Sequence, residues 1–220
     1  MGIDFDVLAL LGSGSLLLIY YLLLLVRVKR DPEFTVHSIN RKARAQWVKD
    51  VMKNYGKKDV MAVQTLRNFS MSATFKASSS ILLILGTLTL SGQAENMAKT
   101  WHVLDVVGSR SADLWVLKIM CLLSVLLIAF FAFAMCLRVL NHVVFMVNLP
   151  EEDAQGSLSP VRVGQRLNSA GSFYTLGMRA FFLAVPLTFW LFGPLFLFLS
   201  TVGLIVALYH LDRNPLAENI

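Results

Sequence analysis

Cysteine is scarce in this chain, and its placement excludes a disulfide framework. Two cysteines, Cys121 and Cys136, stand in one apolar stretch of the 220-residue sequence. If that stretch is a helix, the two lie roughly 22 Å apart at about 1.5 Å per residue, whereas a disulfide needs Cα atoms within about 7 Å of each other. No C-x-x-C motif is present, so the cysteines predict no metal site either. We interpret both as small buried or lipid-facing thiols.

Catalytic motifs are absent as well. The sequence contains no nucleophile elbow, no H-E-x-x-H, no P-loop and no glycine-rich dinucleotide turn. No aspartate or glutamate stands in the apolar parts of its long hydrophobic segments, which argues against an acid-based proton relay. We therefore expect a protein that is not an enzyme and that carries neither a cofactor nor a metal ion.

What the chain has in excess is apolar sequence. Hydrophobic residues make up 56% of it and the mean hydropathy is +0.62, against about 45–50% apolar residues in soluble domains. The excess lies in long blocks, and about 20 apolar residues suffice for a helix to cross a hydrocarbon core of about 30 Å. We predict four spans, at about residues 7–26, 69–90, 114–137 and 181–209. Pro186 and Pro194 lie inside the last span and should kink it.

The basic residues predict the orientation of these spans. Residues 27–76 carry 12 Lys and Arg and residues 138–179 carry four more, which is 16 of the 20 in the chain. Because Lys and Arg concentrate in cytoplasmic loops, we place residues 27–68 and 138–180 in the cytoplasm. Four spans then leave both termini outside, and the membrane is expected to be a bacterial inner (plasma) membrane. Residues 91–113 form the predicted loop between the second and third spans.

Two predicted helices are longer than a membrane needs. The helix over 59–90 measures roughly 48 Å and the helix over 114–149 roughly 54 Å, at about 1.5 Å per residue. We expect their excess length to extend into the cytoplasm. Residues 150–172 are polar and rich in Gly, Ser and Pro, and we expect a cytoplasmic loop there, with a short helix around 161–167.

The segment 35–55 has the pattern of an amphipathic helix. Apolar residues recur every three or four positions on one predicted face; they are Val36, Ile39, Ala43, Trp47, Val51 and Tyr55. Basic residues occupy much of the remaining, polar face; they are Arg41, Lys42, Arg44, Lys49 and Lys53. This face either lies in the lipid interface or covers the cytoplasmic ends of the long helices, and both can hold together. The predicted fold is all-α: a four-transmembrane-helix bundle with long cytoplasmic helix extensions and one amphipathic cytoplasmic helix, in a single integral membrane domain over residues 1–220.

Polar residues spaced by four mark one face of the second predicted helix. The candidate cavity or ligand residues on this helix are Gln64, Arg67, Asn68, Ser72 and Lys76. A lysine inside a span is costly and often functional, but near the end of a span its long stem also reaches the headgroups. Arg138 and His142 of the third segment are candidates that could face this stripe, and Arg179, which precedes the apolar run of the fourth segment, is a further candidate. Three interpretations remain: the stripes line a polar cavity, they join packed helices by hydrogen bonds, or the stripe of the third segment lies outside the membrane and is exposed to water.

Three stretches of the chain resemble a known family. They are AVQTLRNFSMSATFKASSSILLILG (62–86), FWLFGPLFLFLSTVGLIVALYHLD (189–212) and RAQWV (44–48). They resemble the bacterial and plant membrane proteins of domain-of-unknown-function family 599, over nearly all of the chain. The resemblance implies a multi-pass membrane fold. It implies no activity, so no catalytic residue can be transferred from it.

The functional prediction is correspondingly broad. We expect a non-enzymatic homo-oligomer with a polar cavity or pore for ions or small anionic solutes. The alternative is an accessory or scaffold subunit of a larger membrane complex, and a lipid-modifying enzyme has the least support. The expected partners are anionic lipid headgroups at the basic cytoplasmic face and further copies of the chain, with no nucleic acid.

Overall fold

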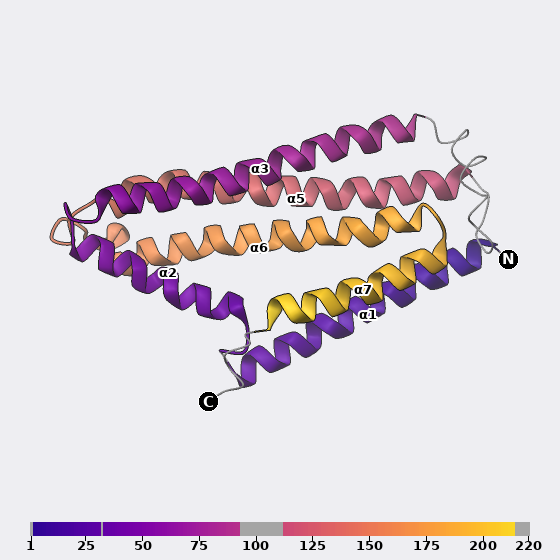
Figure 1. The fold of residues 1–220 in the computed structure, drawn as a ribbon, viewed down its shortest axis with the longest axis horizontal. Helices are drawn as coiled ribbons and strands as arrows, with labels where there is room; N and C mark the ends of the chain where they lie inside the picture. The colour runs from indigo at the N-terminus through magenta and orange to yellow at the C-terminus, as the bar shows by residue number, and fades with distance from the viewer. Residues whose placement is uncertain (1, 32, 93–111, 214–220) are drawn as a thin grey trace. The chain divides into compact units, whose positions relative to one another are not determined.

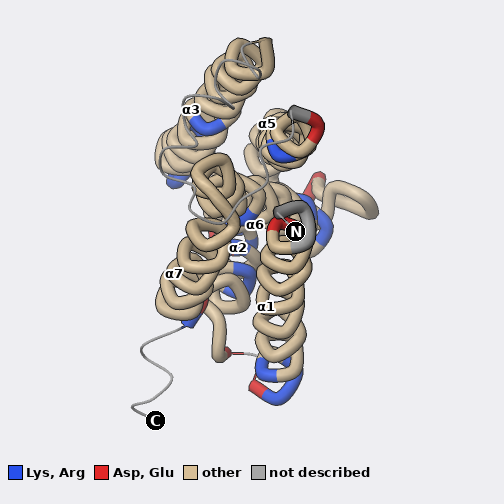
Figure 2. Tube along the Cα trace, turned by 90° about the vertical axis from the view of Figure 1, so that its right-hand side faces the viewer, with Lys and Arg blue, Asp and Glu red and all other residues tan. Residues whose placement is uncertain are grey.

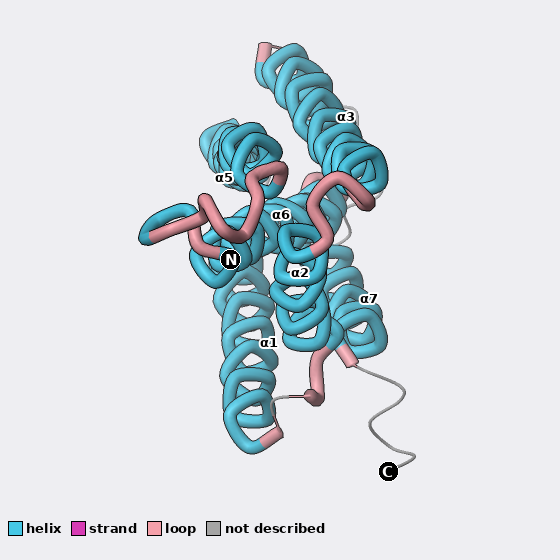
Figure 3. Tube along the Cα trace, turned by 90° about the vertical axis from the view of Figure 1, so that its left-hand side faces the viewer, coloured by secondary structure: helices cyan, strands magenta, loops and turns pink. Residues whose placement is uncertain are grey.

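The computed structural model describes residues 2–31, 33–92 and 112–213, and most of these residues are helical. The predicted outer loop falls largely on residues 93–111, which lie outside the described residues. The helices of the described ranges are α1 (Gly2–Arg30), α2 (Val36–Lys53), α3 (Asp59–Ser91), α5 (Ala112–Val147), the short 3-10 helix η2 (Gly156–Leu158), α6 (Pro160–Trp190) and α7 (Pro194–Asp212) (Figure 1). No strand occurs within these ranges, which confirms the all-α prediction (Figure 3).

The single helix predicted for the fourth span, residues 181–209, is wrong, because this segment contains parts of two helices. In the described ranges, five helices are long and apolar enough to cross a membrane, and α6 and α7 are two of them. The chain turns between Trp190 and Pro194. Gly193 has a φ of 139°, a conformation that favours glycine, and Pro194 is well suited to the first position of a new helix. Pro194 therefore begins a helix, whereas we predicted that it would kink one.

The predicted loop over 150–172 ends earlier than expected, because α6 begins at Pro160 and continues through and beyond the short helix predicted around 161–167. Two glycines of this stretch are sites of close packing. A Cβ on Gly164 would lie 3.4 Å from the Cα of Ala45. A Cβ on Gly171 would lie 2.5 Å from Arg44 Cζ. Glycine at these positions lets α2 approach α6 closely.

The chain forms two compact units, each assembled from separate stretches of sequence. Unit 1 comprises Met1–Val36, Leu82–Leu127 and Ala180–Ile220. Unit 2 comprises His37–Ile81 and Ile128–Arg179. Thus α3, α5 and α6 each contribute residues to both units, while α7 belongs to unit 1 and nearly all of α2 to unit 2.

Unit 2 has a continuous apolar core to which α2 contributes. Val48, Val51 and Met52 of α2 join a buried cluster with Leu66 of α3 and Leu140 of α5, among others. Burial of each such side chain contributes about 1.5–3 kcal/mol. Of the two interpretations left open for the amphipathic helix, this core supports the one in which α2 covers the long helices.

The buried face of α2 is rotated from the predicted one. Val36 and Tyr55 are 36% and 52% exposed, and α2 ends at Lys53 before Tyr55 is reached. The buried side is centred on Val48 instead, and Arg44, one turn earlier, is half-buried on that side. A basic residue that we assigned to the polar face therefore points into the unit.

In unit 1, α1 and α7 run in the same direction side by side (Figure 1). Tyr20, in the second half of α1, donates a hydrogen bond to Oδ2 of Asp212, the last residue of α7, at 2.8 Å. At their N-terminal ends, Phe5 and Pro194 line the same pocket. The basic residues that end α1 are seen in blue in Figure 2. They consequently lie at the same end of unit 1 as the C-terminus of α7.

Candidate functional site

The predicted cavity residues of α3 and α5 are mostly exposed. Gln64, Arg67 and Asn68 of α3 are exposed, as are Arg138 and His142 of α5. The structure does not bring these five side chains together in a cavity of one chain, and their role stays a prediction. Arg179 is half-buried on α6.

Ser72 and Lys76 are packed against Tyr174 of α6. The hydroxyl groups of Ser72 and Tyr174 are 2.9 Å apart and hydrogen-bonded. The Lys76 ammonium lies 6.0 Å from the centroid of the Tyr174 ring, at the outer limit of a cation–π contact. The same ring meets Phe69 of α3 and Phe133 of α5 edge to face. Tyr174 thus joins three helices of unit 2.

Arg44 of α2 reaches α6 through Asn168. Its Nε donates to Asn168 Oδ1 at 3.0 Å, and Asn168 Nδ2 donates to the carbonyl oxygen of Arg41 at 3.1 Å. The guanidinium rests on Gly171, where a Cβ would lie 2.5 Å from Arg44 Cζ. One amide side chain therefore fixes α2 at two positions, and a glycine makes the space for the guanidinium.

The guanidinium of Arg44 is incompletely paired. Its Nη2 is buried and has no hydrogen-bond partner, a situation that costs about 1–3 kcal/mol or more for a charged group. Burial lowers the pKa of Arg44, the nearby Cys136 acts in the opposite direction, and Arg41 adds to the lowering. Burial and Arg41 disfavour the positive charge, and an anion beside Arg44 would favour it.

A pocket of about 270 Å³ adjoins Arg44. Three helices of unit 2 line it, with Ala43, Arg44 and Trp47 from α2, Thr65, Leu66 and Phe69 from α3, and Leu167 from α6. Except for Arg44 and Thr65, these side chains are apolar. The arrangement combines one cation with an apolar wall, which is the composition typical of a small-ligand site.

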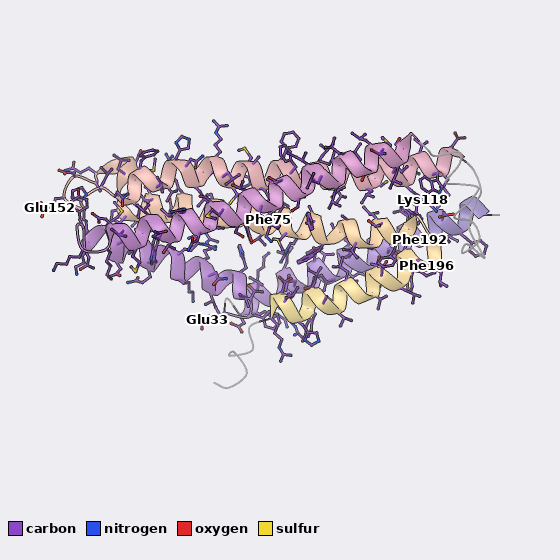
Figure 4. The ribbon with its side chains drawn as sticks, turned by 45° about the horizontal axis from the view of Figure 1, so that its top comes forward. Glu33, Phe75, Lys118, Glu152, Phe192 and Phe196 are labelled. Atoms are coloured by element: carbon purple, nitrogen blue, oxygen red, sulfur yellow. The ribbon has the colours of Figure 1, made fainter. Side chains whose placement is uncertain are left out.

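Unit 1 contains a buried ion pair that the sequence analysis missed. Lys118 Nζ of α5 lies 3.0 Å from Asp6 Oδ1 of α1, with the two side chains 2% and 0% exposed. Trp190 Nε1 donates to the same oxygen at 2.9 Å, and the ammonium lies 5.5 Å from the centroid of the Trp190 ring. Lys118 is labelled in Figure 4. Its position inside an apolar run was the available signal, because a lysine there needs a partner.

The chain matches one described family. The family "Protein of unknown function, DUF599" matches residues 8–216, a range that includes Arg44, Asn168 and Lys118 but begins after Asp6. No curated protein and no solved structure matches the chain. The match confirms the resemblance found in the sequence, and the chain belongs to this family of proteins of unknown function.

Proposed function

We propose that this protein is a multi-pass integral membrane protein that binds anionic lipid headgroups through the basic cytoplasmic side of α2 and performs no catalysis. The observation that carries the proposal is the division of α2 into two sides. Val48 and Met52 are buried in unit 2, while Arg41, Lys49 and Lys53 are exposed. Because the apolar side is already covered, binding to a membrane surface would be electrostatic.

The length of the connection supports a position close to the membrane. Only residues 31–35 separate the end of α1 from the start of α2, and five residues reach at most about 18 Å. Each Lys or Arg near an anionic leaflet contributes about 1 kcal/mol to attraction. Arg27, Lys29 and Arg30 at the end of α1 add to the same basic region of the sequence.

We further propose that the N-terminus is outside and the C-terminus in the cytoplasm of an inner membrane. The expectation of both termini outside required an even number of crossings, and five candidate spans give an odd number. The parallel packing of α1 and α7 supports the revision, because both helices then cross in the same direction. Their basic C-terminal ends fall on the cytoplasmic side, as the distribution of Lys and Arg favours.

The test compares the full-length protein in lipid nanodiscs of two compositions. We expect a higher unfolding temperature in discs containing phosphatidylglycerol than in pure phosphatidylcholine discs, and a smaller difference at high salt. The variant Arg41→Gln/Lys49→Gln/Lys53→Gln should lose the difference in unfolding temperature between the two kinds of disc. The matched control is Lys57→Gln/Arg162→Gln/Arg166→Gln, which removes three exposed charges outside α2 and should keep it. Equal differences in both variants would contradict the proposal.

A second candidate function is a polar cavity shared by several copies of the chain. Gln64, Arg67 and Asn68 favour it, because they are exposed on one side of α3 and a further copy can cover them. The measurement is the mass of the detergent-solubilised protein together with chloride flux from liposomes. A monomer without flux counts against this function. A stoichiometric partner of another sequence would favour the accessory-subunit alternative.

A further inference from the structure

Arg44 carries its charge toward the interior of unit 2 without a counterion. Among the residues that the structure describes, no carboxylate forms an ion pair with it. Its one hydrogen-bonded side chain is Asn168, which is neutral and cannot balance the charge. Arg41, about one turn earlier on α2, is a second cation and disfavours the positive charge of Arg44. The local electrostatics therefore favour the binding of an anionic group.

The surroundings of Arg44 specify more than an anion. The adjoining pocket is lined by Trp47, Leu66, Phe69 and Leu167, which offer an apolar wall and no further cation. A small hydrophilic anion would leave this wall exposed to water, whereas an acyl chain would cover it. At about 270 Å³, the pocket is slightly smaller than the usual range for small-molecule sites. A pocket of this size fits a single acyl chain better than a bulky group.

From these two features we propose that the pocket binds one acyl chain of an anionic lipid, whose headgroup pairs with the guanidinium of Arg44. The inference deepens the proposed function, on which it rests, by assigning a defined site to a lipid that would otherwise contact only the exposed charges of α2. Asn168 and Gly171 are positioning residues in this site, because they hold the guanidinium at the edge of the pocket.

The experiment uses the full-length protein in phosphatidylcholine nanodiscs and dibromostearate as the probe. Trp47 lines the pocket, so bromine atoms on the bound chain should quench its fluorescence saturably. The Trp47→Phe variant supplies the background from the other tryptophans. Dodecyl phosphate should compete with the probe, whereas inorganic phosphate and zwitterionic dodecylphosphocholine should not. Competition by inorganic phosphate as strong as by dodecyl phosphate would overturn the assignment of the acyl chain.

Two variants test the contribution of the Arg44 charge and that of the acyl-chain pocket separately. Arg44→Gln should weaken probe binding by at least about tenfold, since a hydrogen bond to a charged group is lost, and Arg44→Lys should recover part of it. Ala43→Phe keeps Arg44 and fills the pocket, and it should weaken binding similarly. Arg166→Gln, at an exposed arginine of the same unit, should bind as the wild type. Unchanged binding in Arg44→Gln and Ala43→Phe would overturn the inference.

The inference and the proposed function fail in different ways. If phosphatidylglycerol does not stabilise the wild-type protein, the proposed function is contradicted, irrespective of whether the pocket binds the probe. Retention of that stabilisation with no saturable quenching of Trp47 would overturn the pocket assignment alone. Circular dichroism of each variant, compared with the wild type, shows whether a loss of binding comes from a loss of fold.

Discussion

Lys118 on α5 lies 3.0 Å from Asp6 on α1, with both side chains buried in unit 1. The pair joins the start of α1 to the start of α5, and Trp190 at the end of α6 donates a further hydrogen bond to Asp6. Few other described α1 side chains are buried, and most are exposed or half-buried. Asp6 is therefore a principal polar contact between α1 and the rest of unit 1.

Replacement of Asp6 by Asn should destabilise the protein strongly. The substitution removes the negative charge and leaves the Lys118 ammonium buried without compensation, which costs about 3–5 kcal/mol. The measurement is the free energy of unfolding of the full-length protein in detergent. Asp153→Asn, at an exposed acidic residue, is the control and should change it little.

The double variant Asp6→Leu/Lys118→Met should recover much of this loss. Replacing a buried ion pair by apolar groups of similar size is often neutral or stabilising, so the double variant should be more stable than Asp6→Asn. If the double variant is instead the less stable of the two, the pair makes a contribution that its charges alone do not explain.

Gly177→Ala should lower stability through overpacking. The added Cβ would lie 2.7 Å from the ring of Phe133, which is fully buried and contacts Tyr174. The ring has little room to move, so the expected cost is about 1–3 kcal/mol. Gly86→Ala is the matched control, because nothing lies within 4 Å of its added Cβ and alanine favours a helix. A thermal unfolding series of the two variants gives the comparison, and equal midpoints would contradict the packing argument.

The sequence predicted the helices that are set by local patterns. The helix predicted over 59–90 is observed over Asp59–Ser91, because a long apolar and amphipathic pattern needs no distant partner to be recognised. The reversal at Gly193 was missed although Gly-Pro is visible in the sequence. A Gly-Pro pair is compatible with a kinked helix and also with a reversal of the chain between two helices. The distinction depends on where α7 packs, and its contact between Asp212 and Tyr20 joins residues 192 positions apart.

The candidate site was harder to predict for a related reason. Charged residues are normally assigned to the solvent-exposed face of an amphipathic helix, and Arg44 was assigned to that face. Its half-buried position depends on Asn168, 124 residues away, and on the absence of a side chain at Gly171. The spacing of polar residues on α3 was visible, but spacing alone does not distinguish an exposed row from a cavity wall.

Tyr174→Phe should cost less than truncation of the same side chain. It removes the hydrogen bond to Ser72, worth about 0.5–1.5 kcal/mol, and keeps the edge-to-face contacts with Phe69 and Phe133. Tyr174→Ala also loses those contacts and should be clearly more destabilising. Ser72→Ala combined with Tyr174→Phe tests the hydrogen bond, because the two losses should not add if they remove the same interaction. Additive losses in the unfolding free energy would show that the hydroxyl groups act separately.

The direction of α7 gives a prediction about topology. If α1 and α7 cross in the same direction, a green fluorescent protein fused after residue 220 should fold in the cytoplasm and fluoresce, and an alkaline phosphatase fused there should be inactive. Phosphatase fused after Phe192, in the turn between α6 and α7, should be active because that turn lies outside. The reverse pattern at the C-terminus would restore a chain with both termini outside, and α6 and α7 would then not both cross the membrane.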